Sequence, residues 1–410
     1  MSEWKSVTVR ELAVDKGLVG GPFGSSLVSK DYVPTGVPVI RGGNLATESK
    51  FNDDQFVFVS PEKVERDLSR NLALPGDVVF TQRGTLGQVG LVPSTAFDRY
   101  VVSQSQMRLR VDRRIALPEY VYYYFRSSQA IAMIKNHAIA TGVPHINLGI
   151  LGSMTIALPS VDLQQGICDV LGVLDDRIAA NERVVQKSYE LFQATWVKAA
   201  SISQDFVRVS DVAVIDKGLS YKGEGLGGRT PLVNLGNFTS DGQFKASALK
   251  FYDGESKDRH WVGRNDLVMA NTDLTQRRDI LGQPALVDAE KALFTHHVFA
   301  VRPVAGMEDE RLWLYGVFRD PLFRDRAMTY ATGTTVLALP KDAVLSYKLP
   351  WPAEGVRRTW TDRAQSLVGS SAARVEESRK LSQLRNLLLP GLMSGAISVR
   401  HAVRAAEDVL

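Results

Sequence analysis

Short apolar runs rich in β-branched residues mark residues 1–160. Glycine, proline, asparagine and aspartate separate these runs, a pattern that predicts short strands joined by turns. The runs lie at Val37–Ile40, Phe56–Val59, Val78–Phe80, Val89–Val92 and Met107–Val111. A helix is predicted from Pro118, a favoured first helical residue, toward His137. Residues 1–160 are therefore expected to form one mixed α and β domain.

A different pattern over residues 161–200 predicts one long helix. Proline is absent there, and apolar positions recur at alternating spacings of four and three residues. The stripe consists of Ile167, Leu171, Leu174, Ile178, Asn181, Val185, Ser188 and Phe192. A long helix with so narrow an apolar stripe needs a partner helix, and a buried Asn181 would fix the register of the pair.

A second long helix is predicted over residues 354–392. Its seam is rougher and ends at Pro390-Gly391, a typical helix stop. The seam contains Val368, Ser371, Val375, Ser378, Leu381, Leu384 and Leu388. Pairing of the two helices is favoured because each follows one copy of a repeat, described next. The alternative is two unrelated core helices. Residues 393–410 form a C-terminal tail.

Six short segments of the first half return in the same order in the second half. Val9–Leu18 returns as Val209–Leu219, and Gly76–Phe80 returns as Asn265–Met269. The other matches are Val37–Leu45 with Arg229–Phe238, Gly87–Val92 with Gly282–Val287, Ala140–Gly142 with Ala331–Gly333, and Leu158-Pro159 with Leu349-Pro350. So long a period is not that of a solenoid. Residues 201–353 are therefore expected to be a second domain resembling the first.

Composition changes this picture little. The chain has 410 residues, 44% hydrophobic and 23% charged, as in ordinary globular proteins. A net charge of +4 leaves nucleic acid open as a partner. The single cysteine, Cys168, excludes an internal disulfide and fits a reducing compartment. The first residues lack an apolar signal segment, and no run is long enough to span a membrane, so we expect a cytoplasmic protein.

Motifs of several enzyme classes are missing. The sequence has no Pro-Pro pair for an amino-methyltransferase loop, no Gly-Lys-Ser/Thr and no Gly-x-Ser-x-Gly. The histidines and the cysteine lack the spacing of metal ligands. His296 and His297 are adjacent, so in a strand they would point to opposite faces. Glu48-Ser-Lys50 and Glu255-Ser-Lys257 are interpreted as solvated turns. The pattern predicts a protein that binds rather than transforms.

Several segments together resemble one known family, the specificity subunits of type I DNA restriction–modification systems. The resemblance covers essentially the whole chain, and the order domain, helix, domain, helix carries it more than any one motif. The matching segments are Gly20-Gly-Pro-Phe-Gly-Ser-Ser-Leu27, Val39-Ile-Arg-Gly-Gly-Asn-Leu45, Gly76-Asp-Val-Val-Phe-Thr-Gln-Arg-Gly84, Ser103-Gln-Ser-Gln106, Ala140-Thr-Gly-Val-Pro-His-Ile-Asn147, Leu174-Asp-Asp-Arg-Ile-Ala-Ala-Asn181 and Leu387-Leu-Leu-Pro-Gly-Leu-Met-Ser-Gly395.

The resemblance implies an α+β protein with two target-recognition domains, each reading one half of a bipartite, asymmetric DNA site. It implies that the long helices pair antiparallel as a coiled-coil spacer and dock two modification subunits, which methylate adenine, with restriction subunits added to that core. S-adenosylmethionine, ATP and Mg are expected on those partners, and no cofactor in this chain. The second copy departs from the family pattern because it lacks Pro-Phe-Gly-Ser-Ser.

Candidate DNA contacts are Arg, Lys, Gln, His and Thr residues in loops at strand ends. Arg suits guanine and Gln suits adenine in the major groove. Each candidate also has a plainer interpretation, as a solvated loop, a core-facing strand position or a helix end. The candidates are Lys16, Arg41, Gln82, Arg83, Gln104, Gln106, Thr141, His145, Lys217, Lys222, Gln276, Arg277, Arg278, His296 and Thr334.

Two other functions stay open from the sequence. One is a standalone DNA methyltransferase or nuclease with divergent motifs, which would be active without a partner. The other is a non-catalytic coiled-coil scaffold whose domains no longer read DNA. The resemblance and the missing motifs together favour the interpretation that the chain is a DNA-recognition subunit without catalytic residues.

Overall fold

The computed structural model describes residues 4–45, 49–53, 56–94, 97–139, 143–221, 223–275, 278–333 and 336–409. The chain divides into two compact units. Unit 1 contains Met1–Glu182 and Glu376–Leu410, and unit 2 contains Arg183–Val375. Each unit therefore contains one of the two expected domains together with part of each long helix.

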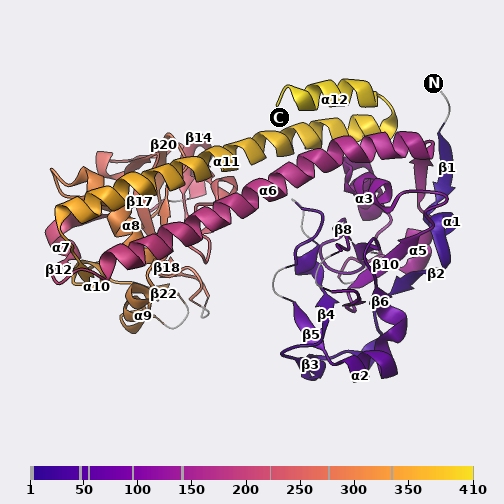
Figure 1. Cartoon of the computed structure of the whole chain (residues 1–410), viewed down its shortest axis with the longest axis horizontal. Helices are drawn as coiled ribbons and strands as arrows, with labels where there is room; N and C mark the ends of the chain where they lie inside the picture. Colours follow the sequence, from indigo (N-terminus) through magenta and orange to yellow (C-terminus); the bar gives the residue numbers. More distant parts are fainter. Residues whose placement is uncertain are drawn as a thin grey trace. The chain divides into compact units, whose positions relative to one another are not determined.

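Unit 1 is built on antiparallel strands (Figure 1). One sheet has the order β2 (Ala13–Gly20), β10 (Gln106–Val111), β7 (Val78–Thr81) and β8 (Val89–Leu91). A second has the order β3 (Tyr32–Val33), β5 (Val57–Val59), β4 (Val37–Ile40), β9 (Tyr100–Val102) and β6 (Leu72–Ala73), with β4 and β9 parallel. β1 (Lys5–Thr8) pairs with β11 (Thr155–Leu158).

Unit 1 contains several short helices, and most of them contribute buried side chains to one apolar core. They are α1 (Val9–Leu12), α2 (Pro61–Lys63), α3 (Pro118–Arg126), α4 (Ser128–Asn136), α5 (Leu148–Ser153) and α12 (Val399–Glu407). Pro118 begins α3, and most of its aromatic side chains are buried in the main core of the unit. The same core contains Ala402 and Ala406 of α12, so the C-terminal tail packs as a helix.

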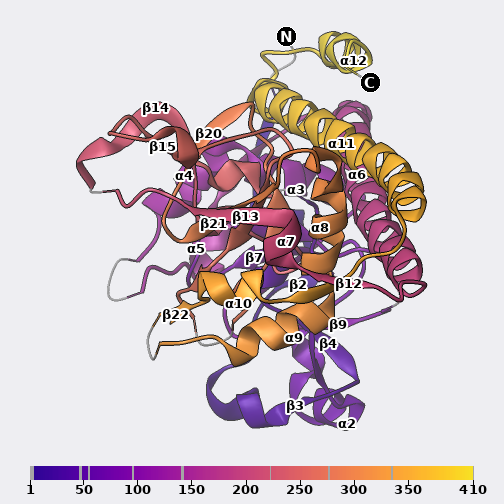
Figure 2. The ribbon, with the colours of Figure 1, turned by 90° about the vertical axis from the view of Figure 1, so that its left-hand side faces the viewer.

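Unit 2 repeats this plan (Figure 2). Its sheets have the orders β13 (Ala213–Lys217), β21 (Val298–Pro303), β17 (Leu267–Ala270), β19 (Pro284–Leu286), and β15 (Lys250–Tyr252), β14 (Leu226–Val233), β20 (Lys291–Phe294), β16 (Trp261–Gly263). Two strand pairs are β12 (Phe206–Arg208) with β23 (Lys348–Pro350), and β18 (Thr272–Asp273) with β22 (Leu337–Ala338). The helices are α7 (Val209–Val212), α8 (Arg311–Arg319), α9 (Pro321–Thr329) and α10 (Lys341–Leu345).

The repeat extends to single hydrogen bonds in two turns. The Asp77 carboxylate accepts from Leu74 N at 2.8 Å. The Asp266 carboxylate accepts from Gly263 N at 2.8 Å. The residue before each aspartate has a positive φ, 86° at Gly76 and 65° at Asn265. Asparagine tolerates this left-handed conformation better than most residues, so the two turns keep one geometry with different sequences.

The turn after β4 and its counterpart after β14 repeat in the same way. Asn44 and Asn237 each accept a backbone N–H three residues earlier through the side-chain oxygen, at 2.8 Å in both cases. Both side-chain amides donate to a carbonyl eight residues later. These asparagines therefore hold the backbone, as asparagine in turns commonly does.

The two long helices are α6 (Val161–Ala200) and α11 (Glu354–Ser394). In unit 1, Arg177 pairs with Glu377 at 2.6 Å and Asp175 pairs with Arg385 at 2.7 Å. The partner number rises in one helix as it falls in the other, so the helices run antiparallel. The stripe residues of α6 are all buried except Ser188, which is half-buried.

Two expectations for α11 are wrong. Pro390 does not end the helix but lies inside it, and the helix continues to Ser394 before Gly395, whose φ is 73°. Leu392 and Met393 are buried in the core of unit 1, which outweighs the one hydrogen bond that proline removes. Val375 is 42% exposed, so it does not belong to the seam.

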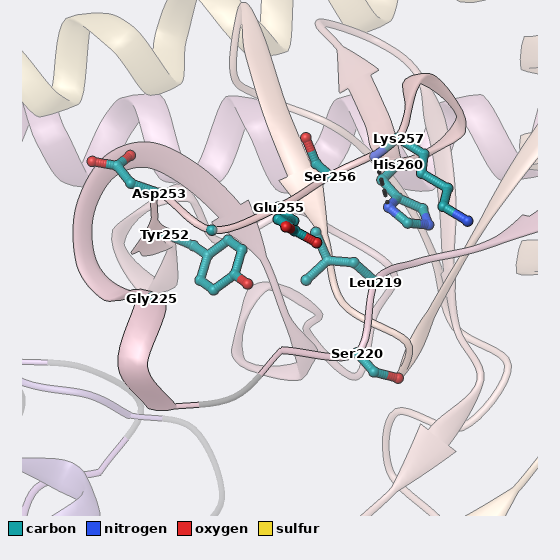
Figure 3. Close-up of a pocket in the computed structure, with 10 residues that line it drawn as sticks. Leu219, Ser220, Gly225, Tyr252, Asp253, Glu255, Ser256, Lys257 and His260 are labelled. Atoms are coloured by element: carbon teal, nitrogen blue, oxygen red, sulfur yellow. Dashed lines mark hydrogen bonds between the residues drawn. The ribbon is translucent and has the colours of Figure 1, made fainter.

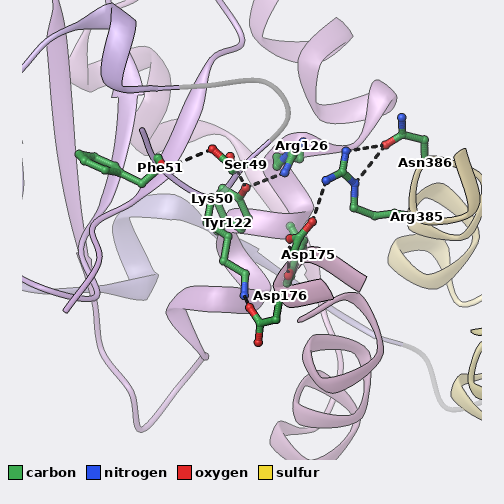
Figure 4. A network of polar contacts seen from close by, with 10 residues as sticks. Ser49, Lys50, Phe51, Tyr122, Arg126, Asp175, Asp176, Arg385 and Asn386 are labelled. Carbon is green, nitrogen blue, oxygen red and sulfur yellow. Dashed lines mark hydrogen bonds and ion pairs between the residues drawn. The ribbon is translucent and has the colours of Figure 1, made fainter. Parts of the chain in front are cut away.

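The helix pair contacts each unit through different chemistry. In unit 1, Tyr123 of α3 donates to Asp175 at 2.8 Å. Asp175 also pairs with Arg385, which is 2% exposed (Figure 4). In unit 2, Phe192, Trp196 and Trp360 from the long helices pack on Trp313 and Tyr315 of α8. Gly316 of α8 makes room for this cluster, because an added Cβ would meet the Trp196 indole.

Candidate nucleic-acid interface

Backbone hydrogen bonds gather several loops of unit 1 at one end of its first sheet. Gly21 N donates to Gln106 O at 2.9 Å, and Gln82 N donates to Ser105 O at 2.7 Å. Ile146 N donates to Gln82 O at 3.0 Å. We call this surface edge 1. It consists of the loop 20–27, residues 82–83, the turn 103–105 and residues 143–145.

Edge 1 brings together three predicted contact residues. Gln82 and Arg83 follow β7 directly, and Arg83 forms an isolated β-bridge with His145. Arg83 is exposed, and Gln82 and His145 are partly exposed. Arg41 is also exposed and follows Ile40, whose carbonyl accepts from Ser103 N at 3.0 Å. Arginine, glutamine and imidazole groups thus occur together on a rigid sheet end.

Two glutamines predicted as DNA contacts hold the fold instead. Gln106 is 1% exposed, and its side chain accepts from Ser103 Oγ. The prediction for Gln106 is therefore wrong, because β10 is a central strand in which both Gln106 and the following Met107 are buried. Gln104 lies in the turn and is exposed, but its amide donates to Gly24 O at 2.7 Å and Leu27 O at 2.9 Å. Gln104 therefore positions the loop 20–27.

Unit 2 has the same backbone frame, which we call edge 2. Asn271 N donates to His297 O at 3.0 Å, and Leu339 N donates to Asn271 O at 2.8 Å. His296 N donates to Leu219 O at 2.8 Å. Edge 2 consists of residues 217–221, 271–272, the turn 295–297 and Ala338. By these bonds Gln82 corresponds to Asn271, Ser105 to His297 and Gln104 to His296.

The sequence match of Lys16-Gly17 with Lys217-Gly218 is not a structural match. Gly20 pairs with Met107 and Lys217 pairs with Phe299, so Lys217 corresponds to Gly20. β2 contains a bulge that β13 lacks, and Lys16 lies in it with a φ of 53°. Lys16 is exposed but is not part of edge 1, whereas Lys217 is exposed on edge 2.

The side chains of edge 2 differ from those of edge 1. His296 and His297 lie in a turn rather than a strand, and their rings stack with centroids 3.9 Å apart. The expectation that they point to opposite faces is therefore wrong. His297 Nδ1 lies 3.2 Å from Thr272 Oγ1. Burial lowers the pKa of His297, and His296, Lys217 and Lys250 lower it further.

Lys250 and Phe23 were missed by the sequence prediction. Lys250 Nζ lies 3.4 Å from the Tyr221 hydroxyl, so Lys250 adjoins edge 2. It comes from β15, a strand distant in sequence from the other residues of edge 2, and no local sequence pattern predicts this position. Phe23 is 82% exposed in the loop 20–27. Its signal in the sequence was present, because a phenylalanine between proline and glycine in a loop has no core face.

The remaining predicted residues divide into two groups. Arg278 is exposed with a φ of 59°, and its carbonyl accepts from Arg324 at 3.1 Å. It follows β18 and is not bonded into edge 2 by the hydrogen bonds above. Thr141, Lys222, Gln276, Arg277 and Thr334 lie outside the residues that the structure describes.

A hollow of about 650 Å³ lies beside edge 2 (Figure 3). Leu219 and Ser220 form one side, and Tyr252, Glu255, Lys257 and His260 are among the residues of the other. Glu255 and Lys257 are both exposed. Across the described part of the chain, no three His, Cys, Asp or Glu side chains gather as a metal site would require. Within the same residues no helix is both long and apolar enough to cross a bilayer.

The fold is that of a known class of protein. Over 95% of this chain and 96% of the other, it matches the crystal structure of the S subunit of a type I restriction–modification system from M. genitalium, with a TM-score of 0.56 and 14% identity. The HsdS subunit from Thermoanaerobacter tengcongensis matches over 97% of this chain and 98% of its own, with 16% identity and a TM-score of 0.37.

Sequence comparison agrees over part of the chain. Residues 1–187 match the family model for the type I restriction modification DNA specificity domain. A stretch of 164 residues is 26% identical to the type I restriction enzyme HindI specificity subunit of Haemophilus influenzae. This stretch covers 38% of the chain and 35% of that subunit, about a third of the relative's length.

The resemblance to the specificity subunits of type I restriction–modification systems is thereby confirmed. The match to the family model extends over residues 1–187, which is less than half of the chain.

Proposed function

We propose that this chain is the DNA-recognition subunit of a type I restriction–modification enzyme in the cytoplasm. Unit 1 reads one half of a bipartite, asymmetric site, and unit 2 reads the other. The observation that carries the proposal is the pair of edges. The same backbone bonds recur at Gln82 and Asn271, yet the side chains they present differ. Two readers of one design with different side chains suit two different half-sites.

Each edge offers groups that recognise DNA. In edge 1, Arg83 and Gln82 carry the donors and acceptors that distinguish guanine and adenine in the major groove. In edge 2, the exposed Lys217 and Lys250 suit phosphate, whose neutralisation gives a salt-dependent affinity. Edge 1 therefore offers groups for base reading, and edge 2 offers lysines for phosphate contacts.

Catalysis is assigned to partner chains. Two modification subunits would dock on the paired helices α6 and α11, bind S-adenosylmethionine and methylate adenine. Restriction subunits with ATP and Mg would join through them. The M. genitalium S subunit, whose fold this chain shares, supports the assignment to such an assembly. A standalone enzyme and a scaffold that ignores DNA are the alternatives that experiment must separate.

The test is to co-express the chain with its modification subunit and to map methylated adenines by long-read sequencing. We expect one bipartite motif. Arg83→Ala should relax specificity at a single position of one half-site, by about 5- to 150-fold. Lys217→Ala should weaken binding to all sequences and lower the salt slope by about one.

The control is Arg66→Ala, which removes an exposed arginine of unit 1 outside edge 1 and should leave the motif intact. Methylation by the chain alone would favour a divergent enzyme. Methylation without any sequence preference by the assembled complex would favour a scaffold.

A further inference from the structure

Phe23 is the most exposed large apolar side chain among the described residues, at 82%. Burying a phenylalanine typically stabilises a protein by about 1.5–3 kcal/mol, and the fold forgoes this. A single exposed apolar residue is ordinary on a surface. Phe23 differs because of the loop that holds it and the groups around it.

The loop 20–27 is held at both ends and from the side. The Asn71 amide donates to Gly20 O at 2.7 Å, and Leu27, 3% exposed, anchors the other end in an apolar cluster. Gln104 donates to two carbonyls of the loop. Gly21 packs so closely against the Ser103 carbonyl that a Cβ would collide with it. Phe23 is therefore presented outward by a fixed backbone.

The surroundings of Phe23 match a nucleic-acid surface. Gly20, at the start of the loop, lies beside Gln82, because a Cβ there would be 3.7 Å from the Gln82 side-chain oxygen. Arg83 is next along the chain and exposed. Phe23 thus lies in the loop whose first residue adjoins Gln82. Proteins that unstack a base step insert an apolar side chain and use Arg or Gln nearby to hold the nucleic acid.

Edge 2 uses its aromatic residue differently. Tyr221 follows Leu219 closely in the corresponding loop, but its ring packs edge-on against Tyr252 with centroids 6.0 Å apart. Lys250 lies over the same ring, 5.9 Å from its centroid. The Tyr221 ring is therefore engaged within unit 2, whereas the Phe23 ring of edge 1 is exposed.

We propose that Phe23 is a wedge that enters a base step of the half-site read by unit 1 and stacks on the base it displaces. Gln104 is the positioning residue, since it fixes the loop without needing to touch DNA. The inference rests on the proposed function and deepens it, because it makes unstacking of DNA a property of one half-site only.

The experiment uses the complex of the full chain with its modification subunit, on duplexes of the mapped motif. 2-Aminopurine is placed singly at purines of each half-site, apart from the adenine that becomes methylated, and S-adenosylmethionine is omitted. For the wild type we expect a rise in fluorescence at one position of the unit 1 half-site. Phe23→Ala should abolish this rise and weaken binding about 10- to 100-fold.

Matched variants separate the wedge from general damage. Phe23→Trp should keep both the fluorescence rise and the affinity, and Gln104→Leu should reduce both while leaving thermal stability near that of the wild type. Phe206→Ala removes a 60% exposed phenylalanine of β12 and should change neither.

Four results overturn the wedge. Phe23→Ala binding within about twofold of wild type with an unchanged fluorescence rise is the first. The second is that the wild type shows no fluorescence rise, and that replacing thymine with uracil in the duplex lowers its affinity as much as Phe23→Ala does. This result identifies a contact with the thymine methyl group instead. Loss of complex assembly by Phe23→Ala identifies a protein contact. A rise in the unit 2 half-site alone assigns the distortion to edge 2. If the wild-type complex modifies no defined sequence, the proposed function itself fails.

Discussion

The two units contact the same pair of helices differently at one equivalent position. In unit 1 a buried ion pair, Asp175 with Arg385, is completed by Tyr123. In unit 2 the position corresponding to Tyr123 is Gly316, and the Trp196 indole occupies the room that it leaves. The match follows from Tyr122–Arg126 and Tyr315–Arg319, which repeat the same hydroxyl contact four residues apart.

This difference teaches where a duplicated fold tolerates change. The turns at Asp77 and Asp266 keep their hydrogen bonds, whereas the helix contact at the position shared by Tyr123 and Gly316 exchanges a buried ion pair for aromatic packing. A buried ion pair gives little net stability, but it penalises any register that separates its members. Aromatic packing gives more stability and less selectivity. Unit 1 is thus expected to set the register of the helix pair, and unit 2 to strengthen it.

The largest effect is expected from Asp175→Ala. It removes the Asp175 carboxylate from the buried Arg385 guanidinium, which should lower the free energy of unfolding by about 3–5 kcal/mol. Chemical denaturation of the full chain, followed by circular dichroism, measures this. The double variant Asp175→Leu, Arg385→Leu should recover most of the loss, since apolar replacement of both partners removes the buried charge. A loss below about 1 kcal/mol in the single variant would place the pair among weak surface contacts.

A smaller loss is expected from Gly316→Ala in unit 2. The new methyl group meets the Trp196 ring, and such overpacking typically costs about 1–3 kcal/mol. Gly369→Ala is the matched control, because it adds the same group to a helix of unit 2 where nothing lies within 4 Å. Helix propensity alone should make that control more stable by up to about 1 kcal/mol. Equal shifts of thermal midpoint in the two variants would contradict tight packing at Gly316.

The smallest effect concerns protonation of edge 2. Burial and the neighbouring His296, Lys217 and Lys250 lower the pKa of His297 in the folded chain. Below the ordinary histidine value of about 6.5, the unfolded chain therefore binds more protons than the folded chain. Stability should then fall as pH drops through that range, and His297→Gln should lessen the fall by less than about 1 kcal/mol, because solvent screens the partly exposed ring.

Thermal melts at pH 7.5 and 5.5 measure this dependence. His137→Gln in unit 1 is the matched control for losing one histidine. A steeper decline in the His297→Gln variant than in the wild type would reverse the sign and reject the electrostatic account.

The sequence predicted those parts of the fold that depend on local pattern. Spacing along α6 is sufficient to identify a long helix. Gly76 and Asn265 mark turns, because these residue types tolerate the left-handed backbone conformation better than most. The α11 seam was harder, because Arg385 is buried there while the apolar Val375 is exposed. The burial of Arg385 depends on its ion pair with Asp175, which is distant in sequence, and residue spacing does not predict such a contact.

The candidate interface was predicted less well than the fold. Arg83 and His145 lie together in loops at one end of the sheet, as predicted contact residues should. Gln106 is buried, however, and the Gln104 amide holds the neighbouring loop 20–27. The bulge in β2 displaced Lys16 from the position that its match with Lys217 suggested. Loop residues of one type serve either a ligand or the backbone, and only three-dimensional contacts distinguish these roles.

The assignment of α11 to both units has a consequence for how the chain is made. Unit 2 needs nothing beyond Val375, whereas the core of unit 1 includes Leu381, Leu388 and Ala406. During synthesis, which adds about 5–20 residues per second, unit 2 is complete while unit 1 still waits for its last segment. The first half to leave the ribosome is therefore the last to mature, and an early stop codon would harm the half that had already been translated.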